Sequence, residues 1–399
     1  MTGPDSSEAP GEPDHQVGLG TIAKEWGRIG CIGFGGPPAH IALLRDLCVE
    51  RRGWLTTEEF EDGIAATNLL PGPASTQLAI LCAWRLQGPA GALIGGLCFI
   101  VPGLVVILAL SVPFFAPDAP LWVRGAAAGA GAAVPAVALR ASVGLLPGSS
   151  RRAGAERSAR SRWVVYLVLG AVSAATVGPW LVLVLAACGV VEATVRSPGR
   201  RPWPTRRVAV LPPAVVPALA TGGLAALSWV ALKVGLFSYG GGFVIIPMMQ
   251  HDAVHTYHWM TAGQFLDAVA LGQITPGPLV QTVAVVGYAA SGVVGGLVAA
   301  FVAFAPSFVF ILVGGPRFDR LRTNHWAQGF LTGAGAASIG AIAGATVPLA
   351  LSLEHLWQFG VLAAAAVWVF ALRRGVVSAL VGAGLLGVAA AYAGLHLPA

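Results

Sequence analysis

The chain carries one uncommon motif twice, in register and 205 residues apart (Gly35 and Gly240). In each copy a pair of glycines is followed by a tryptophan, a threonine, a phenylalanine, an aspartate and a Pro-Gly-Pro triplet. The spacing between these residues is the same in both copies. Chance matches among abundant Ala and Gly would not align these residue types. The chain is therefore an internal duplication, and we expect it to fold as two similar halves. The residues that recur unchanged are, in the first copy, Gly30, Gly35, Gly36, Val49, Trp54, Thr56, Phe60, Asp62, Ala65, Pro71, Gly72 and Pro73.

The apolar content of the two halves indicates the medium in which they fold. Of the 399 residues, 56% are hydrophobic and only 11% are charged, which is too apolar for a soluble globular protein. Apolar runs at 91–115, 293–313 and 356–372 reach or approach the roughly 20 residues that cross about 30 Å of hydrocarbon. Gly91-xxx-Gly95 and Gly125-xxx-Gly129 have the spacing by which membrane helices pack through small residues. The sequence predicts an all-α, multi-pass protein of the cytoplasmic membrane.

Each copy of the motif interrupts an apolar segment. Residues 60–70 and 74–86 are each too short to span a membrane, and Pro71-Gly72-Pro73 separates them. Residues 265–288 repeat this layout around Pro276-Gly277-Pro278. Two half-length helices around a Pro/Gly break predict a re-entrant hairpin or a discontinuous pair of helices. We expect about five spans plus one such broken pair in each half.

The loop charges predict that the two halves lie in opposite orientations. The loop after the long span of the first half is acidic at Asp118, whereas its counterpart holds Arg317, Arg320 and Arg322. The next loop of the first half has five arginines, whereas the equivalent loop has Glu354 and no Lys or Arg. Because basic loops stay in the cytoplasm, matched loops of opposite charge indicate inverted repeats. Inverted repeats are typical of secondary transporters, whose site lies where the repeats meet.

We expect four regions along the chain. They are a disordered N-terminal tail at 1–17, a first transmembrane repeat at 18–195, a basic, Pro-rich cytoplasmic linker at 196–214 and a second transmembrane repeat at 215–399. A membrane scaffold is the alternative to a transporter, although it would not explain two polar, helix-breaking motifs at matched positions.

Other kinds of chemistry find little support. The chain has two lysines, Lys24 and Lys233, and neither follows a glycine, so it has no phosphate-binding loop. No nucleophile–base arrangement indicates an enzyme, and we expect no cofactor. His251, His255 and His258 share a helical spacing, but without further ligand residues nearby we expect no metal there. The net charge of +6 comes from short basic tracts between apolar segments, so nucleic acid is not an expected partner.

The breaks themselves suggest an anion site. Pro73 and Pro278 would each start a helix whose free N–H groups and positive dipole end lie inside the membrane. Two such helix starts that point at one place would bind an anion, although a tight packing kink is the plainer interpretation of either break alone. Arg28 and Lys233 are equivalent cations, and a charge within an apolar helix costs at least ~2.5 kcal/mol at the bilayer centre. The alternative is that both extend to the membrane surface.

Two further pairs of polar residues match across the repeats. Asp62 and Asp267 would carry protons or balance the two cations, and Asn68 and Gln273 would donate to a bound oxygen or cap helices. The residues that we expect to bind the anion are Arg28, Gly35, Gly36, Asn68, Pro71, Gly72, Pro73, Ser75, Thr76, Lys233, Gly240, Gly241, Gln273, Pro276, Gly277, Pro278 and Gln281.

The doubled motif resembles that of a known family. Phe34-Gly35-Gly36-Pro37, Arg51-Arg52-Gly53-Trp54-Leu55 and Leu70-Pro71-Gly72-Pro73 resemble the chromate ion transporter family. Gln264-Phe265-Leu266-Asp267 and the segment from Gly272 to Pro278 resemble the second-half signature of its long-chain members. The resemblance implies export of chromate from the cytoplasm, chromate resistance and coupling to the proton motive force.

Chromate suits the predicted site in kind, because it is a tetrahedral dianion. Sulfate is close to it in size and charge and would bind equally well. An inside-negative potential favours export of a dianion by about 2.3 kcal/mol per charge per 100 mV. We therefore predict a chromate exporter, with an importer or exchanger of sulfate or another small dianion as the alternative. The oligomeric state stays open, a homodimer included.

Overall fold

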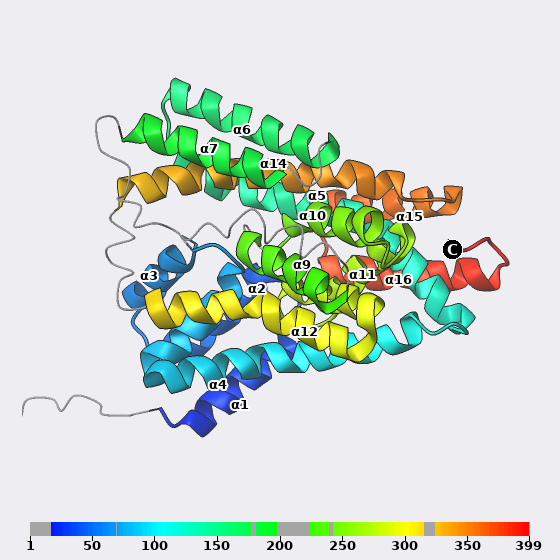
Figure 1. Cartoon of the computed structure of the whole chain (residues 1–399), viewed down its shortest axis with the longest axis horizontal. Helices are drawn as coiled ribbons and strands as arrows, with labels where there is room; N and C mark the ends of the chain where they lie inside the picture. The colour runs from blue at the N-terminus through cyan, green and yellow to red at the C-terminus, as the bar shows by residue number, and fades with distance from the viewer. Residues whose placement is uncertain are drawn as a thin grey trace, which may run out of the picture.

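The computed structural model describes residues 17–68, 70–176, 181–197, 223–238, 242–314 and 324–398, and within these ranges the protein is helical, with no strand (Figure 1). Residues 1–16 of the expected tail and 198–214 of the expected linker lie outside the described residues. The first repeat holds α1 (Leu19–Ile32), α2 (Pro37–Arg45), η1 (Asp46–Arg51), α3 (Thr57–Thr67), α4 (Ala74–Phe114), α5 (Leu121–Ala153), α6 (Arg157–Thr176) and α7 (Leu181–Arg196). The second holds α9 (Gly223–Phe237), α10 (Ile245–Gln250), η4 (His251–Thr256), α11 (Ala262–Ile274), η5 (Leu279–Gln281), α12 (Thr282–Gly314), α14 (His325–Leu351), α15 (Leu356–Ala366), η7 (Val367–Ala371) and α16 (Val376–Tyr392).

The helices that lead into the breaks begin in the same way in both repeats. Thr56 accepts a hydrogen bond from the backbone N–H of Glu59, and the Glu59 side chain accepts one from the Thr56 N–H. Thr261 and Gln264 make the same reciprocal pair at the start of α11. This capping box satisfies two N–H groups that the helix start would leave free.

Both α4 and α12 contain a sharp turn, so each is a helical hairpin with a short and a long arm. Gln87 and Gly88 leave helical geometry in α4, and Ser291 and Gly292 do so in α12. The short arm of α4, residues 74–86, folds back so closely on the long arm that a Cβ added to Gly91 would lie 2.2 Å from the carbonyl oxygen of Ala83. The predicted division into a short helix and a full span is therefore confirmed.

The long arms of α4 and α12 pack side by side and run in opposite directions. Gly96 of α4 faces Phe308 of α12, whereas Leu108, further along α4, faces Gly296, which comes earlier in α12. Figure 1 shows the same reversal for the next pair, because α5 runs from right to left and α14 from left to right. The inverted orientation of the two repeats is thus confirmed.

The repeats also exchange contacts through small residues. A Cβ added to Gly129 of α5 would lie 2.2 Å from the carbonyl oxygen of Ala383 on α16. A Cβ added to Gly333 of α14, the equivalent residue, would lie 2.2 Å from the carbonyl oxygen of Cys188 on α7. The same contact is made twice with the roles of the repeats exchanged, as a two-fold axis requires. The packing role predicted for the Gly125-xxx-Gly129 motif is confirmed.

Each repeat opens with a second interrupted pair of helices. The 14 residues of α1 rise about 21 Å, short of the about 30 Å that a span needs. The chain then turns at Gly35 and Gly36, whose φ angles are 100° and 72°, and returns through α2 and η1. Trp54, just beyond η1, stacks on Trp26 of α1 with ring centroids 6.4 Å apart. The segment of residues 37–51 is therefore helical and runs back along α1.

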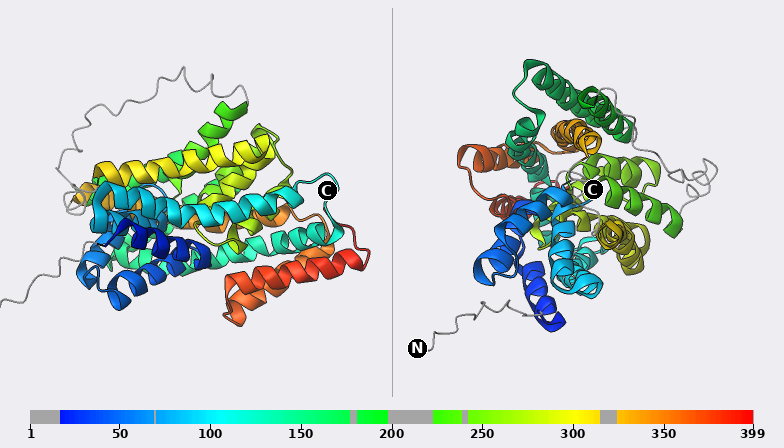
Figure 2. Two further views of the ribbon diagram at one scale, coloured as in Figure 1. Left: turned by 90° about the horizontal axis from the view of Figure 1, so that it is seen from below. Right: turned by 90° about the vertical axis from the view of Figure 1, so that its left-hand side faces the viewer.

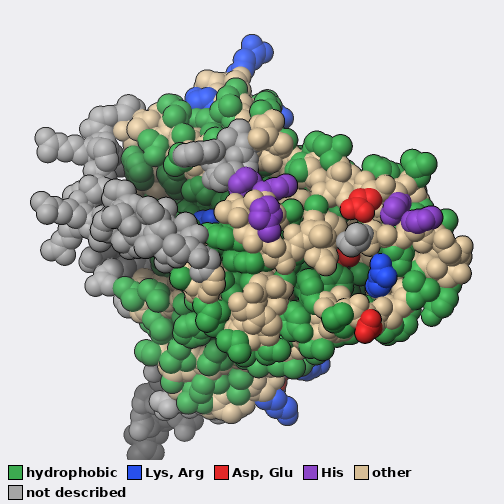
Figure 3. Space-filling model, turned by 45° about the vertical axis from the view of Figure 1, so that its right-hand side comes forward, with side chains coloured by type: hydrophobic (Ala, Val, Ile, Leu, Met, Phe, Trp, Pro, Cys, Tyr) green, Lys and Arg blue, Asp and Glu red, His purple; other side chains and the backbone are tan. Residues whose placement is uncertain are grey.

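The outer surface is that of a membrane protein. Among the described residues, four helices are long and apolar enough to cross a bilayer: α4, α5, α12 together with η5, and α14. Large apolar side chains point outwards from them, with Phe301 77% and Leu351 78% exposed. Figure 3 shows one face on which most of the visible surface is hydrophobic or uncharged, with scattered charged side chains and a cluster of histidines. An exposed apolar surface of this extent suits lipid contact.

Basic residues gather at one end of the bundle. Arg151 and Arg152 close α5, and Arg196 at the end of α7 donates a hydrogen bond to the carbonyl oxygen of Ala153. The left-hand view of Figure 2 shows the long arms of α4 (cyan) and α12 (yellow) lying side by side along the same direction. In most membrane proteins, basic ends of this kind face the cytoplasm.

Candidate functional site

The first break is held by the second repeat. Gly72 is buried and has a φ of 112°. A Cβ added there would lie 2.7 Å from Nε2 of Gln77 and 3.0 Å from the carbonyl oxygen of Gly235 in α9, and the Ser307 hydroxyl of α12 is 3.6 Å from the same point. α9 and α12 therefore press on the break so closely that only glycine fits.

The second break is held by the first repeat in the same manner. Gly277 donates its backbone N–H to the carbonyl oxygen of Gly33, directly after α1, at 2.9 Å. Nε2 of Gln281 donates to the carbonyl oxygen of Ile100 on α4 at 2.8 Å. Gly103, also on α4, lies so close to the Pro276 carbonyl that no side chain would fit. Each repeat thus completes the broken pair of the other.

Both breaks lie near the point where α4 and α12 cross. The antiparallel contacts of these helices are centred near Ile100 and its equivalent, Phe304. Ser307 touches the first break and Gly103 the second. Each is three residues beyond this point on its own helix, roughly 4.5 Å at 1.5 Å per residue. The breaks therefore flank the two-fold axis, at the interface where the sequence analysis expected the site.

Polar side-chain atoms without a hydrogen-bond partner gather at this interface. An unpaired buried polar group costs about 1–3 kcal/mol, so such atoms are uncommon in protein interiors. Within the described part of the chain, most of them belong to the breaks or to residues beside them. A polar ligand would use this hydrogen-bonding capacity. The atoms are Thr76 Oγ1, Gln77 Oε1, Ser238 Oγ, Gln273 Nε2, Gln281 Oε1 and Ser307 Oγ.

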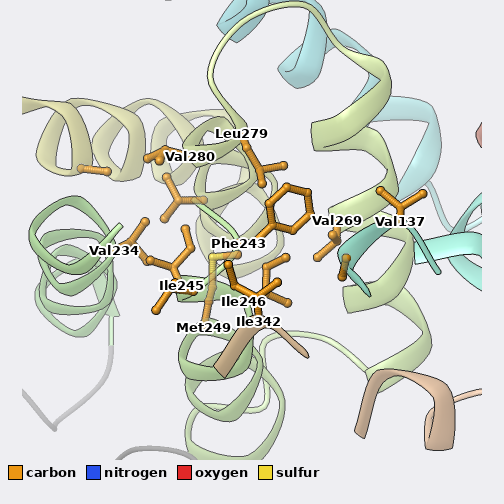
Figure 4. Close-up of a cluster of buried hydrophobic side chains, with 14 of the residues drawn as sticks. Val137, Val234, Phe243, Ile245, Ile246, Met249, Val269, Leu279, Val280 and Ile342 are labelled. Carbon is orange, nitrogen blue, oxygen red and sulfur yellow. The ribbon is translucent and has the colours of Figure 1, made fainter. Parts of the chain in front are cut away.

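The surroundings of the two breaks differ chemically. After the first break, the buried hydroxyl of Ser75 lies 3.3 Å from Nδ1 of His40. After the second break, Val280 belongs to a cluster of buried hydrophobic side chains that also contains Ile245, the residue equivalent to His40 (Figure 4). At these two positions, the first break has polar side chains and the second has apolar ones.

His40 is fully buried and uses both ring nitrogens. Its Nε2 lies 2.9 Å from the carbonyl oxygen of Gly33, its Nδ1 faces Ser75, and its ring meets Phe99 edge to face with centroids 5.1 Å apart. His40, Ser238 and Ser307 are not among the site residues expected from the sequence. The one signal for His40 is that it interrupts an otherwise closely matched repeat, since the second copy has Ile245 there.

Comparison with known proteins shows which family shares the sequence of both repeats. The family model described as Chromate transporter matches residues 20–192 and 225–388, one match for each repeat. The chain belongs to the chromate transporter family. A chromate transport protein of Cupriavidus metallidurans is 34% identical over 337 residues, which cover 81% of this chain and 80% of that relative. A chromate transport protein of Pseudomonas aeruginosa is 32% identical, covering 81% and 79%, and a probable one of Synechococcus elongatus is 29% identical, covering 82% and 84%. No solved structure matches the chain.

In this member of the chromate transporter family, the two matched cations lie in different settings. Arg28 is exposed on α1. Lys233 on α9 forms an ion pair with Asp252 of η4 at 2.5 Å and lies over the ring of Trp229. Arg28 is therefore at the surface, and Lys233 is a paired cation. In the first repeat, Arg52 and Glu25 form the corresponding ion pair, with the acid on the first helix instead of the base.

The other matched residues of this family member also divide between the repeats. Asp62 and Asn68 are exposed, and both make contacts. Asp267 is half-buried, and its Oδ1 lies against Gly131 of α5 so closely that a Cβ there would be 2.2 Å from it. Gln273 is half-buried, with its Nε2 unpaired. Gly35 is exposed and Gly36 partly so, whereas Gly240 and Gly241 lie outside the described residues.

Proposed function

We propose that this chain carries chromate across the cytoplasmic membrane and out of the cell, and thereby confers chromate resistance. The family supports this, as do relatives named for chromate transport that match both repeats. The observation in the chain itself that carries the proposal is the set of buried, unpaired polar atoms at the two breaks.

A tetrahedral oxyanion fits the donors at the first break. The hydroxyls of Thr76 and Ser307 are buried and unpaired, and the helix that begins at Ala74 leaves its first N–H groups without helical partners. Oε1 of Gln77, beside the same break, would accept from water or from a protonated oxygen of the anion. An inside-negative potential favours outward movement by about 2.3 kcal/mol per charge per 100 mV.

Uptake of dianions into everted membrane vesicles tests the function. Everted vesicles from cells that express the chain should accumulate labelled chromate faster than vesicles from cells with an empty vector, because export from the cytoplasm becomes uptake there. Accumulation only in right-side-out vesicles would contradict export, and equal rates in expressing and control vesicles of both orientations would contradict transport.

The second candidate is import or exchange of sulfate or a similar dianion. Hydroxyl and backbone donors, which are the groups that line the first break, would bind sulfate as well as chromate. Competition decides between the candidates: unlabelled sulfate should leave chromate uptake largely unchanged if the site prefers chromate, and should abolish it if the site is built for sulfate.

Coupling to protons is part of the proposal, with Asp62 and Asp267 as the first candidates. Asp267 is the stronger of the two, because it is half-buried and makes no ion pair with any described residue, whereas Asp62 is exposed. A carboxyl that is kept from water without a cation favours its protonated form.

A further inference from the structure

His40 holds the Ser75 hydroxyl in a defined state. A carbonyl oxygen can only accept, so the His40 Nε2 that lies 2.9 Å from the Gly33 oxygen must carry a hydrogen. In the neutral ring, Nδ1 is then an acceptor, and the Ser75 hydroxyl 3.3 Å away donates to it. Neutral His40 therefore occupies the one hydrogen that Ser75 could offer to a ligand.

Adding one proton to the ring reverses this hydrogen bond. Nδ1–H of the imidazolium donates to Ser75 Oγ, and the hydroxyl hydrogen turns away from the ring. Ser75 is in the first turn of the helix after the first break, beside the buried and unpaired hydroxyl of Thr76. The freed hydrogen is therefore available to an anion at that helix start, and the new positive charge also favours the anion.

We propose that His40 and Ser75 form a proton-controlled donor pair, in which proton uptake by His40 releases the Ser75 hydroxyl to bind the transported oxyanion at the first break. This proposal rests on the proposed function, because it assumes that the oxyanion occupies the break. It places this donor pair in the first repeat, since the apolar residues Ile245 and Val280 hold the equivalent places in the second.

The charged groups of the helices around His40 leave it as the responsive group. α2 packs against α1, η1 and α4. On α1, Glu25 is paired with Arg52, and Lys24 and Arg28 are exposed. On η1, Asp46 is paired with Arg51, and Glu50 is near Arg45 of α2 itself.

The remaining groups on these helices have other contacts or no charge. Arg85 of α4 donates to the carbonyl oxygen of Glu59. Cys31, Cys48, Cys82 and Cys98 are free cysteines.

Chromate binding at different pH values tests the donor pair. The apparent Kd of labelled chromate is measured with purified protein in lipid nanodiscs between about pH 8 and about pH 5, a range that extends below the usual histidine range because the ring of His40 is fully buried. Chromate itself takes up a proton in mildly acidic solution, but this contribution is common to all variants. The comparison is therefore between slopes of log Kd against pH.

Three variants make the slopes informative. His40→Gln keeps a donor for Gly33 and an acceptor for Ser75 but cannot gain the proton. Ser75→Ala removes the pair from the other side, should His40→Gln fail to fold. His255→Gln makes the same exchange at an exposed histidine of η4.

For each protein, the Kd at the lower pH is compared with its own Kd at the higher pH. We expect this fall in Kd to be about tenfold larger in the wild type and His255→Gln than in His40→Gln and Ser75→Ala, as linkage to one proton allows. Equal slopes in the wild type, His40→Gln and Ser75→Ala would overturn the donor pair and leave the proposed function standing. No chromate binding by the wild type at any pH would overturn both.

Discussion

Gly277 of the second repeat donates its backbone N–H to the carbonyl oxygen of Gly33 in the first repeat, at 2.9 Å. The same carbonyl accepts from His40, so one oxygen joins the second break, the end of α1 and the histidine beside the first break. The interrupted helices of the two repeats are thus not independent kinks. Each is stabilised by the other half of the molecule, and a ligand at either break would contact both repeats.

Alanine at Gly72 should disrupt this arrangement. The residue has a φ of 112°, and a Cβ would lie 2.7 Å from Gln77 and 3.0 Å from the Gly235 carbonyl. Backbone strain alone costs roughly 1–3 kcal/mol, and the contact with a backbone oxygen adds to it. We expect a lower melting temperature in detergent and loss of chromate transport.

Gly88→Ala is the matched control for Gly72→Ala. Gly88 also has a positive φ, 57°, but has open space around it. It should lower the melting temperature less than Gly72→Ala and retain transport. Equal losses in the two variants would show that close packing at the break is not the reason for the glycine.

Gly129→Ala should weaken the association of the repeats. The added Cβ would lie 2.2 Å from the Ala383 carbonyl of α16, and neither backbone can yield without separating the helices. We expect a smaller yield of monodisperse protein on size-exclusion chromatography. Gly382→Ala on α16, where nothing lies within 4 Å, should behave as the wild type. Normal behaviour of Gly129→Ala would contradict the exchanged contact.

The duplication, the inversion and the small-residue contacts were all predictable from the sequence, because each leaves a periodic signal. Matched glycines and prolines reveal the repeat, and loop arginines reveal the orientation. The pairing of Lys233 was not predictable, since its partner Asp252 lies 19 residues further on, at a position where the first repeat has Leu47. A lone cation in an apolar helix gives no sign of which segment will return beside it.

The location of the candidate site was predictable from the sequence, whereas the residues that line it were only partly predictable. Pro-Gly-Pro triplets identify helix breaks, so the expectation fell on the residues that flank them. Ser307 reaches the first break from α12, and its closeness depends on how α12 packs against that break. His40 could be found only by asking where the two copies differ chemically, which is a different question from where they agree.

Removal of Lys233 alone should lower the stability of the protein more than removal of both Lys233 and its partner, Asp252. Lys233→Met leaves Asp252, whose side chain is only 10% exposed, without its partner. Breaking such a pair from one side costs up to roughly 3–5 kcal/mol, whereas replacing both partners with apolar residues is often neutral. Lys233→Met should therefore lower the melting temperature, and Lys233→Met with Asp252→Leu should restore it and support chromate transport. A stable double variant without transport would return Lys233 to the binding site.

The two matched aspartates should differ in their effect on proton coupling. Asp267 is half-buried against α5, whereas Asp62 is exposed to the surroundings. Asp267→Asn should therefore flatten the dependence of chromate uptake on an imposed pH gradient, and Asp62→Asn should leave it unchanged. The measurement is initial uptake into proteoliposomes with and without the gradient. An unaltered response of Asp267→Asn would remove that residue as a proton carrier.

The claim that the transported anion sits at the helix breaks is tested most directly by the chromate Kd of two serine variants. Ser307 and Ser173 are both buried, and both carry an unpaired hydroxyl, but only Ser307 lies at a break. A hydrogen bond to a charged group contributes roughly 1.5–3 kcal/mol, so Ser307→Ala should raise the Kd by about tenfold or more. Ser173→Ala should bind as the wild type does. If Ser307→Ala binds chromate as tightly as Ser173→Ala, the anion does not occupy the breaks.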